Sequence, residues 1–209
     1  MSSFQVKYRP FAGLRSTISL RDNRALVGIS DVLADAPPLV LEALAEILLA
    51  RIFRRRPSRE ARECYLAYVF RPATRRRIDA ARRRRGSKCL LPARGRWHDL
   101  DEIFRRLNWR FFHGRLPVPR LGWSLRRSRT VLGHYDSAHA AIIISRTLDS
   151  SSVPRYLLEY LVYHEMLHMD YPVERQGHRR VLHSREFREA EKKFPRYEKV
   201  RRKLKHFCA

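Results

Sequence analysis

The segment on which the rest of the fold depends runs from Pro154 to His168 and reads Pro-Arg-Tyr-Leu-Leu-Glu-Tyr-Leu-Val-Tyr-His-Glu-Met-Leu-His. Serines precede this segment and Pro172 follows it, so we predict a helix that ends near Met169. In that helix His164 and His168 lie one turn apart on the same face. Two imidazole nitrogens can therefore bind one metal ion, and the rest of the domain must pack around a metal-bearing helix.

Glu165 completes a His-Glu-x-x-His pattern in this helix. Its side chain points about 100° away from that of His164, which directs the carboxylate toward water at the metal rather than toward the metal itself. A zinc ion lowers the pKa of such a water, and a neighbouring carboxylate can accept the proton as the water attacks a carbonyl carbon. The pattern therefore predicts a hydrolase with zinc as its cofactor and Glu165 as its general base.

A catalytic zinc site needs a third protein ligand and keeps a fourth position open. The extended metzincin pattern is excluded, because this chain has Glu174 where that pattern needs a histidine. His183 comes directly before a predicted helix, and Phe187, one turn further on, would anchor that helix in the core. We favour His183 as the third ligand. Glu186 and His178 are the alternatives, and Glu186 could instead orient a ligand imidazole.

The elements around the metal helix follow from capping signals and periodicity. Asp99 with Glu102 forms a capping-box-like start for a helix that ends at Gly114, and a last helix begins near Ser184. Strands are expected at residues 121–127, 131–135 and 140–145. Their short polar turns favour an antiparallel meander, so we predict an α+β fold with a small antiparallel or mixed sheet packed on the metal helix.

Several side chains in this half have less specific roles. Tyr135 and Tyr171 are candidates for lining the cleft or stabilising an oxyanion. The strand at residues 140–145 could bind an extended peptide if it lies at the edge of the sheet. Asn108 is expected to form structural hydrogen bonds, and Trp109 is expected in the core together with its aromatic neighbours.

The first 96 residues are expected to form a hairpin followed by basic helices. The strands Ser16–Leu20 and Ala25–Ile29 flank a polar turn at residues 21–24, and helices are expected to begin at Pro37-Pro38 and near Ser58. We therefore divide the chain into this N-terminal region at residues 1–96, a catalytic core at residues 97–195 and a basic tail at residues 196–209.

The charge of the chain indicates a polyanionic partner. Its 45 Lys and Arg residues against 21 Asp and Glu residues give a net charge of +24. Residues 51–96 contain 17 basic residues and three acidic ones, and residues 192–205 contain eight and one. Such density attracts DNA or another polyanion. The arginines that we expect to make this contact are Arg75, Arg76, Arg77, Arg82, Arg83, Arg84 and Arg85.

Composition excludes several other classes of protein. The longest mostly apolar run, at residues 39–50, contains Glu42 and Glu46 and is too short to span a bilayer. The N-terminus lacks the apolar stretch of a secretory signal, and the three cysteines form no C-x-x-C pair. We therefore expect a cytoplasmic protein with no membrane partner, no disulfide framework and no four-cysteine zinc ribbon.

Between about Leu100 and Phe194 the chain resembles the SprT-like metallopeptidase family, which includes the Spartan proteases. The blocks that carry this resemblance occur in the family's order and are Asn108–Pro117, Leu121–Trp123, Leu132–Tyr135 with Ile142–Ser145, His164–His168 and His183–Phe187. The resemblance implies a compact gluzincin-like core, zinc bound by three histidines, and a glutamate general base. The ligands it implies are His164, His168 and His183, and the base is Glu165.

The same resemblance implies cleavage of proteins that are bound to DNA. Family members often carry a C-terminal zinc ribbon, for which this chain supplies no cysteines. The first ninety residues have no SprT-like counterpart and are weakly similar to the start of the YgjP-like metal-dependent hydrolases. We therefore expect a zinc-dependent endopeptidase that acts on protein or peptide substrates. A basic nucleic-acid-binding protein with a structural or idle zinc site is the alternative.

Overall fold

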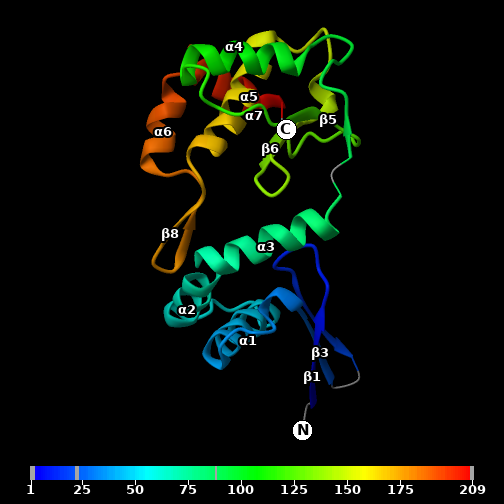
Figure 1. Cartoon of the computed structure of the whole chain (residues 1–209), viewed down its shortest axis with the longest axis vertical. Coiled ribbons are helices and arrows are strands. Elements are labelled where there is room, and N and C mark those ends of the chain that lie inside the picture. Colours follow the sequence, from blue (N-terminus) through cyan, green and yellow to red (C-terminus); the bar gives the residue numbers. More distant parts are fainter. Residues whose placement is uncertain (1–2, 22–23, 88, 208–209) are drawn as a thin grey trace. The chain divides into compact units, whose positions relative to one another are not determined.

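The computed structural model describes residues 3–21, 24–87 and 89–207 and has an α+β architecture (Figure 1). The chain forms two compact units. Unit 1 comprises Met1–Ser87 with Glu174–Val181, and unit 2 comprises Lys88–Val173 with Leu182–Ala209. The division differs from the boundaries expected at residues 96 and 195. Residues just before position 96 already pair with the sheet of unit 2, and those after 195 form a helix of its core.

Unit 1 begins with a three-stranded sheet of β1 (Ser3–Arg9), β2 (Ser16–Arg21) and β3 (Arg24–Ser30). The predicted hairpin of β2 and β3 is confirmed, with Ile18 opposite Val27, and β1 lies parallel to β3 on its other side. Residues 22 and 23 of the expected turn lie outside the described residues.

Three helices follow in unit 1: α1 (Pro38–Ile52), α2 (Arg59–Val69) and α3 (Pro72–Arg85). The predicted helix starts are confirmed, because Pro38 is the first residue of α1 and the hydroxyl of Ser58 caps α2. A hairpin of β8 (Glu174–Gln176) and β9 (Arg179–Val181) also belongs to this unit, where β9 lies against α2. The chain thus leaves unit 2 after Val173 and returns to it at Leu182, just before His183.

Unit 2 contains a four-stranded sheet in the order β4-β5-β7-β6, built from β4 (Leu90–Leu91), β5 (Arg120–Ser124), β6 (Gly133–Asp136) and β7 (Ala141–Ile144). The three predicted strands exist, but the antiparallel meander was wrong, because β5 and β7 pair in parallel. All four side chains of β7 are buried, which requires a central strand. The edge position considered for residues 140–145 therefore belongs to β6.

The helices of unit 2 are α4 (Leu100–Phe112), α5 (Arg155–Asp170), α6 (Arg185–Lys192) and α7 (Tyr197–Phe207). The carboxylate of Asp99 accepts hydrogen bonds from the amides of Asp101 and Glu102, which confirms the predicted start of α4. Val200 of α7 is fully buried in the same core as α4 and α5, so the expected basic tail is part of the fold.

Asn108 of α4 forms the structural hydrogen bonds that we expected, since its amide group pairs with both backbone groups of Leu116. Trp109 was wrongly expected in the core, because it is 77% exposed. Its neighbours at i−2 and i+3, Leu107 and Phe112, occupy the inward face of the helix instead. None of the helices in the described part of the chain is long and apolar enough to cross a membrane.

Candidate metal centre

Three histidine side chains of unit 2 converge on one point. His164 and His168 come from α5, one helical turn apart, and His183 comes from the residue before the cap of α6. One ligand atom from each of the three lies within 4.8 Å of the other two. The Nε2 atoms of His168 and His183 are 3.2 Å apart. Convergence of three imidazoles at this spacing is the geometry of a metal site with three protein ligands.

Phe187 holds the three imidazoles in place. Its ring is fully buried, and its centroid lies 5.2 Å from that of His164, 4.8 Å from that of His168 and 4.6 Å from that of His183. The Ser184 hydroxyl caps α6 by accepting a hydrogen bond from the amide of Phe187. The start of α6 therefore places the third histidine and the aromatic support of all three at once.

Glu191, one turn after Phe187 on α6, contacts the far side of the first histidine. Its Oε1 lies 2.7 Å from Nδ1 of His164 and accepts a hydrogen bond of 2.8 Å from the hydroxyl of Tyr160. The hydroxyl of Tyr197 donates to Oε2. Because Nδ1 of His164 faces a carboxylate, Nε2 is left to face a metal.

Electrostatics in the cluster suit metal binding. Burial, together with the two neighbouring imidazoles, lowers the pKa of His168 to about 4, and burial also lowers the pKa of His183. Burial alone would raise the pKa of Glu191, but hydrogen bonds from His164 and the two tyrosines lower it to about 2. Near neutral pH the imidazoles of His168 and His183 are therefore neutral and can donate lone pairs, and a charged carboxylate lies behind the ring of His164.

Glu165 lies beside the cluster and is 5% exposed. Burial raises the pKa of Glu165 to about 7. The nearby His164 and a hydrogen bond from the backbone amide of Tyr135 lower this pKa, but by less than burial raises it. The carboxylate reaches β6 because residue 133 is glycine. A Cβ atom there would lie 3.1 Å from Oε1 of Glu165 and 3.1 Å from Cδ1 of Ile144. A carboxylate with a pKa near neutrality is well suited to accept and return a proton.

A model of the SprT-like family matches residues 100–206, which is more than half of the chain. The chain belongs to the SprT-like family. The resemblance stated from the sequence is thereby confirmed, and family membership indicates a metallopeptidase-type domain. Neither the comparison with curated proteins nor that with solved structures returned a match.

Two residues that were considered as ligands of this SprT-like domain lie outside the cluster. Glu186 is exposed at the start of α6, where hydrogen bonds from its own backbone amide and from the Ser184 side chain lower the pKa of its carboxyl. His178 lies between β8 and β9 in unit 1, where its Nε2 accepts a hydrogen bond from Arg179. The carboxylate that contacts Nδ1 of His164 belongs to Glu191, which sequence reasoning missed. Glu191 lies four residues after Phe187 and three before Phe194, and this spacing places it on the inward face of α6.

The two candidate tyrosines occupy different positions. Tyr135 lies on β6 and is half-buried, and its contact with Glu165 is made through its backbone amide. Tyr171 follows the metal helix, and its ring meets the ring of Phe187 in an edge-to-face contact with centroids 6.1 Å apart. Tyr135 therefore contacts Glu165 through its backbone, and the ring of Tyr171 packs on the phenylalanine that contacts all three imidazoles.

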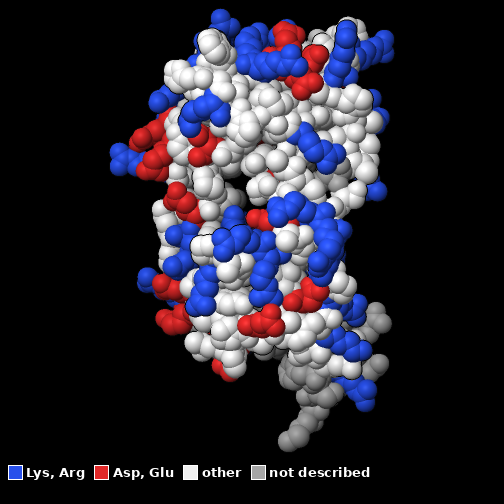
Figure 2. Space-filling view, viewed as in Figure 1, with Lys and Arg blue, Asp and Glu red and all other residues white. Residues whose placement is uncertain are grey.

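The seven arginines expected to bind a polyanion all lie on α3 in unit 1, and Figure 2 shows Lys and Arg side chains gathered over this helix. They are not equivalent. Arg85 forms a two-point ion pair of 2.6 and 2.7 Å with Asp31, and Arg77 pairs with Asp35. Arg75 and Arg82 are half-buried, whereas Arg76, Arg83 and Arg84 are exposed.

Proposed function

We propose that this SprT-like protein is a zinc-dependent endopeptidase. The observation that carries the proposal is the buried carboxylate of Glu165 beside the cluster of His164, His168 and His183. A structural zinc site is closed by four protein ligands and has no use for a general base. A cluster of three imidazoles next to a carboxylate that titrates near neutrality is instead suited to hydrolysis.

The three histidines fit zinc by their chemistry, because neutral imidazoles in a group of three are typical ligands of a catalytic zinc ion. Such an ion supplies a Lewis acid that polarises a carbonyl group and lowers the pKa of water. Glu191 holds the imidazole of His164 in one tautomer and orientation, and Phe187 fixes the rings of all three ligands.

Glu165 would move the protons of the reaction. Its carboxylate accepts a proton from the attacking water, and the resulting carboxylic acid returns the proton to the leaving amine. Burial favours the protonated form of Glu165 and thus reduces the cost of the first transfer. The hydrogen bond from the amide of Tyr135 keeps the carboxylate oriented between the two transfers.

An extended substrate would bind along β6. This strand is the last in the order of the sheet, it lies against α5, and its backbone contacts Glu165 through Tyr135. A peptide that pairs with β6 would present its carbonyl groups beside the general base. Strand addition leaves both ends of the peptide open, which is the arrangement that an endopeptidase needs.

The basic charge of the chain supports nucleic-acid-associated proteins as substrates. The exposed side chains of Arg76, Arg83 and Arg84 on α3 provide one surface that can contact phosphates without giving up an ion pair. The peptidase would then act where a polyanion concentrates its protein substrates.

The test compares the wild-type protein with Glu165→Gln and with Glu159→Gln, a control on the same helix. Bound zinc and cleavage of a DNA-binding protein are measured with and without DNA. We expect all three proteins to bind zinc and only Glu165→Gln to lose cleavage, by at least about a hundredfold, the usual size of a general-base contribution. Equal cleavage by wild type and Glu165→Gln would contradict the mechanism, and zinc binding without cleavage by any of them would favour the nucleic-acid-binding alternative.

A further inference from the structure

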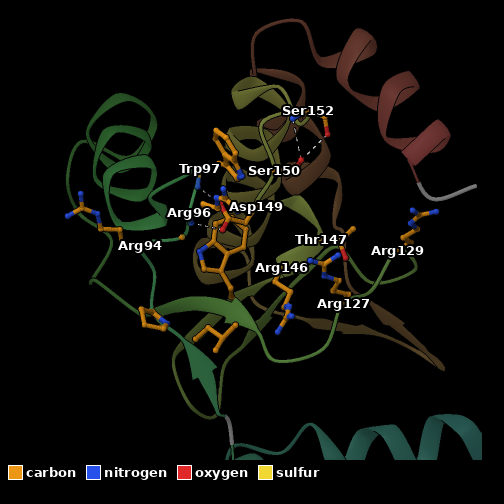
Figure 3. A pocket seen from close by; sticks show the side chains of 14 residues that line it. Arg94, Arg96, Trp97, Arg127, Arg129, Arg146, Thr147, Asp149, Ser150 and Ser152 are labelled. Atoms are coloured by element: carbon orange, nitrogen blue, oxygen red, sulfur yellow. Dashed lines mark hydrogen bonds between the residues drawn. The ribbon is translucent and has the colours of Figure 1, made fainter.

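Unit 2 contains a pocket of about 890 Å³ that includes no residue of the metal centre. Two segments far apart in the sequence supply most of its lining. One is the loop before α4, with Arg94, Arg96 and Trp97, and the other comprises the chain between β5 and α5. Figure 3 shows Arg94 on one side of Trp97 and Arg127, Arg129 and Arg146 on the other. The volume lies at the upper end of the range for ligand-binding pockets, about 300–1,000 Å³.

The pocket is strongly cationic. Five arginines line it, and within the described residues none of them pairs with a carboxylate. The single acidic residue of the lining, Asp149, offsets only one of these five charges and forms no ion pair with them within the described residues. Its carboxylate accepts hydrogen bonds from three consecutive backbone amides, at 2.7 Å from Arg96, 2.9 Å from Trp97 and 3.1 Å from His98. The arginine side chains thus remain exposed to anions from solvent.

The contacts of Asp149 also fix the loop that carries the exposed side chain of Trp97. The Asp149 carboxylate fits against Gly95, where a Cβ atom would lie 2.5 Å from Oδ2, and the ring of His98 lies 3.2 Å from the carbonyl of Ser150. This loop presents Trp97 with 52% of its surface exposed, and the guanidinium of Arg96 lies 5.3 Å from its ring centroid. An exposed indole on a loop fixed by three backbone hydrogen bonds and by the ring of His98 is a preformed stacking platform.

The opposite wall is also fixed in place. The buried hydroxyl of Ser145 accepts a hydrogen bond from the amide of Ser128 and donates one to its carbonyl group. Ser128 lies between Arg127 and Arg129, so this clamp sets the positions from which both guanidinium groups extend. Arg146 in turn donates to the carbonyl of Leu125 at 3.0 Å.

We propose that this pocket binds a single-stranded segment of nucleic acid, with one base stacked on Trp97 and the flanking phosphates held by the arginines. In a duplex the base faces are already stacked on one another, and only an unpaired base can cover an indole ring. An acidic peptide would satisfy the arginines but leaves the exposed indole without a role. The inference rests on the proposed contact with nucleic acid and is independent of the proposed hydrolysis.

The first experiment measures binding of a fluorescein-labelled single-stranded oligothymidylate to zinc-loaded protein by fluorescence anisotropy. We expect Trp97→Ala to weaken binding by about fivefold to a hundredfold, the usual contribution of one stacked base. Trp97→Phe should retain most of the affinity because it keeps an aromatic ring. Trp109→Ala is the matched control, since Trp109 is even more exposed but lies on α4 away from the pocket lining.

The second experiment tests the phosphate contacts through their salt dependence. The double variant Arg127→Ser/Arg129→Ser should reduce the slope of log affinity against log salt by about 1.4, because each contact to a single strand contributes about 0.7. Arg105→Ser/Lys192→Ser, which removes the same charge from exposed positions of α4 and α6, should leave the slope nearly unchanged.

Competition experiments identify the occupant. Unlabelled single strands should displace the probe, whereas a duplex of equal length, inorganic phosphate and polyglutamate should displace it much less. Equal binding by Trp97→Ala and wild type, equal competition by duplex or polyglutamate, or no binding of the oligonucleotide would each overturn the proposal. Peptide hydrolysis is assayed separately in the same preparations, so a failure of the proposed peptidase activity is distinguished from a failure of this site.

Discussion

The Glu191 carboxylate lies 2.7 Å from Nδ1 of His164 and also accepts hydrogen bonds from two tyrosine hydroxyls, those of Tyr160 and Tyr197. This group of four side chains, in which Tyr160 and Glu191 are buried, joins α5 to α6 and α7. The orientation of the His164 ring therefore depends on Glu191, Tyr160 and Tyr197, none of which belongs to the histidine cluster.

Glu191→Gln should weaken zinc binding by about 10- to 100-fold, because the amide cannot supply the charge that makes His164 a stronger ligand. Competition with a zinc chelator measures the change. Glu186→Gln is the control, since Glu186 is exposed on the same helix and contacts no ligand. Equal losses in the two variants would show that the helix rather than the carboxylate is responsible.

Gly133→Ala should lower the rate of peptide hydrolysis while zinc stays bound. The new Cβ atom would lie 3.1 Å from Oε1 of Glu165 and from Cδ1 of Ile144, so the carboxylate must move away from β6. Misplacement of a reacting group by about 1 Å can cost about a hundredfold in rate. Zinc content and cleavage are measured on the same preparation, and an unchanged rate would show that the contact is not needed.

The pH dependence of stability should reveal the titration of Glu165 in the metal-free protein. Burial raises the pKa of Glu165 to about 7 from an ordinary value of 4.5. Since the folded state holds this proton more tightly, the contribution to stability is fully present below pH 4.5 and is lost as the pH rises through 7. The loss amounts to about 3 kcal/mol.

The matched comparison is metal-free Glu165→Gln, which has no titrating group at this position. Its free energy of unfolding relative to wild type should increase by about 3 kcal/mol between pH 4.5 and pH 8, as measured by urea denaturation with a chelator present. Titrations shared by both proteins cancel in this difference. A difference independent of pH would contradict the assigned burial of the carboxylate.

Val200→Ala should destabilise unit 2 by about 2 kcal/mol, because a fully buried side chain on α7 loses apolar area and leaves a cavity. Lys199→Ala, at an exposed neighbouring position, should stay within about 0.5 kcal/mol of wild type. Thermal unfolding measures both. If the two variants behaved alike, the C-terminal segment would be a solvated tail after all.

Substitutions of the neighbouring residues Arg84 and Arg85 on α3 should have different effects, one on polyanion binding and the other on stability. Arg85→Ser should lower the unfolding temperature of unit 1, because it breaks the two-point ion pair with Asp31 and a hydrogen bond to the carbonyl of Phe11. Arg84→Ser should leave that temperature unchanged and weaken retention on heparin, since Arg84 is exposed. The opposite assignment of the two effects would show that the ion pair does not hold α3.

The positions of the two histidines on α5 and of the proposed general base could be predicted because their relationship is local. Helical periodicity alone places His164 and His168 on one face and Glu165 beside them. The capping residues Asp99, Ser58 and Ser184 were equally readable, since a cap involves only the next two or three amides. The family resemblance extended the prediction to His183, which the cluster includes.

Sequence reasoning considered Glu186 and missed Glu191, although both lie on α6. Five residues apart, they occupy different faces of the helix, and the packing of Phe187 and Phe194 determines which face turns inward. The order of the strands also depended on packing, because short turns permit a meander but a strand buried on both faces must be central.

The chain's net charge of +24 showed a different limit of sequence reasoning. A run of arginines appears uniform in sequence, yet Asp31 and Asp35 engage two members of the run on α3 and leave others exposed. The arginines of the cationic pocket around Trp97 come from two segments about thirty to fifty residues apart and form no run in the sequence. Local spacing was therefore enough to predict the helix that carries two of the clustered histidines and the buried glutamate. Only the folded chain decided which distant side chains support that helix and which charges remain available to a partner, because long-range packing assigns each residue its neighbours.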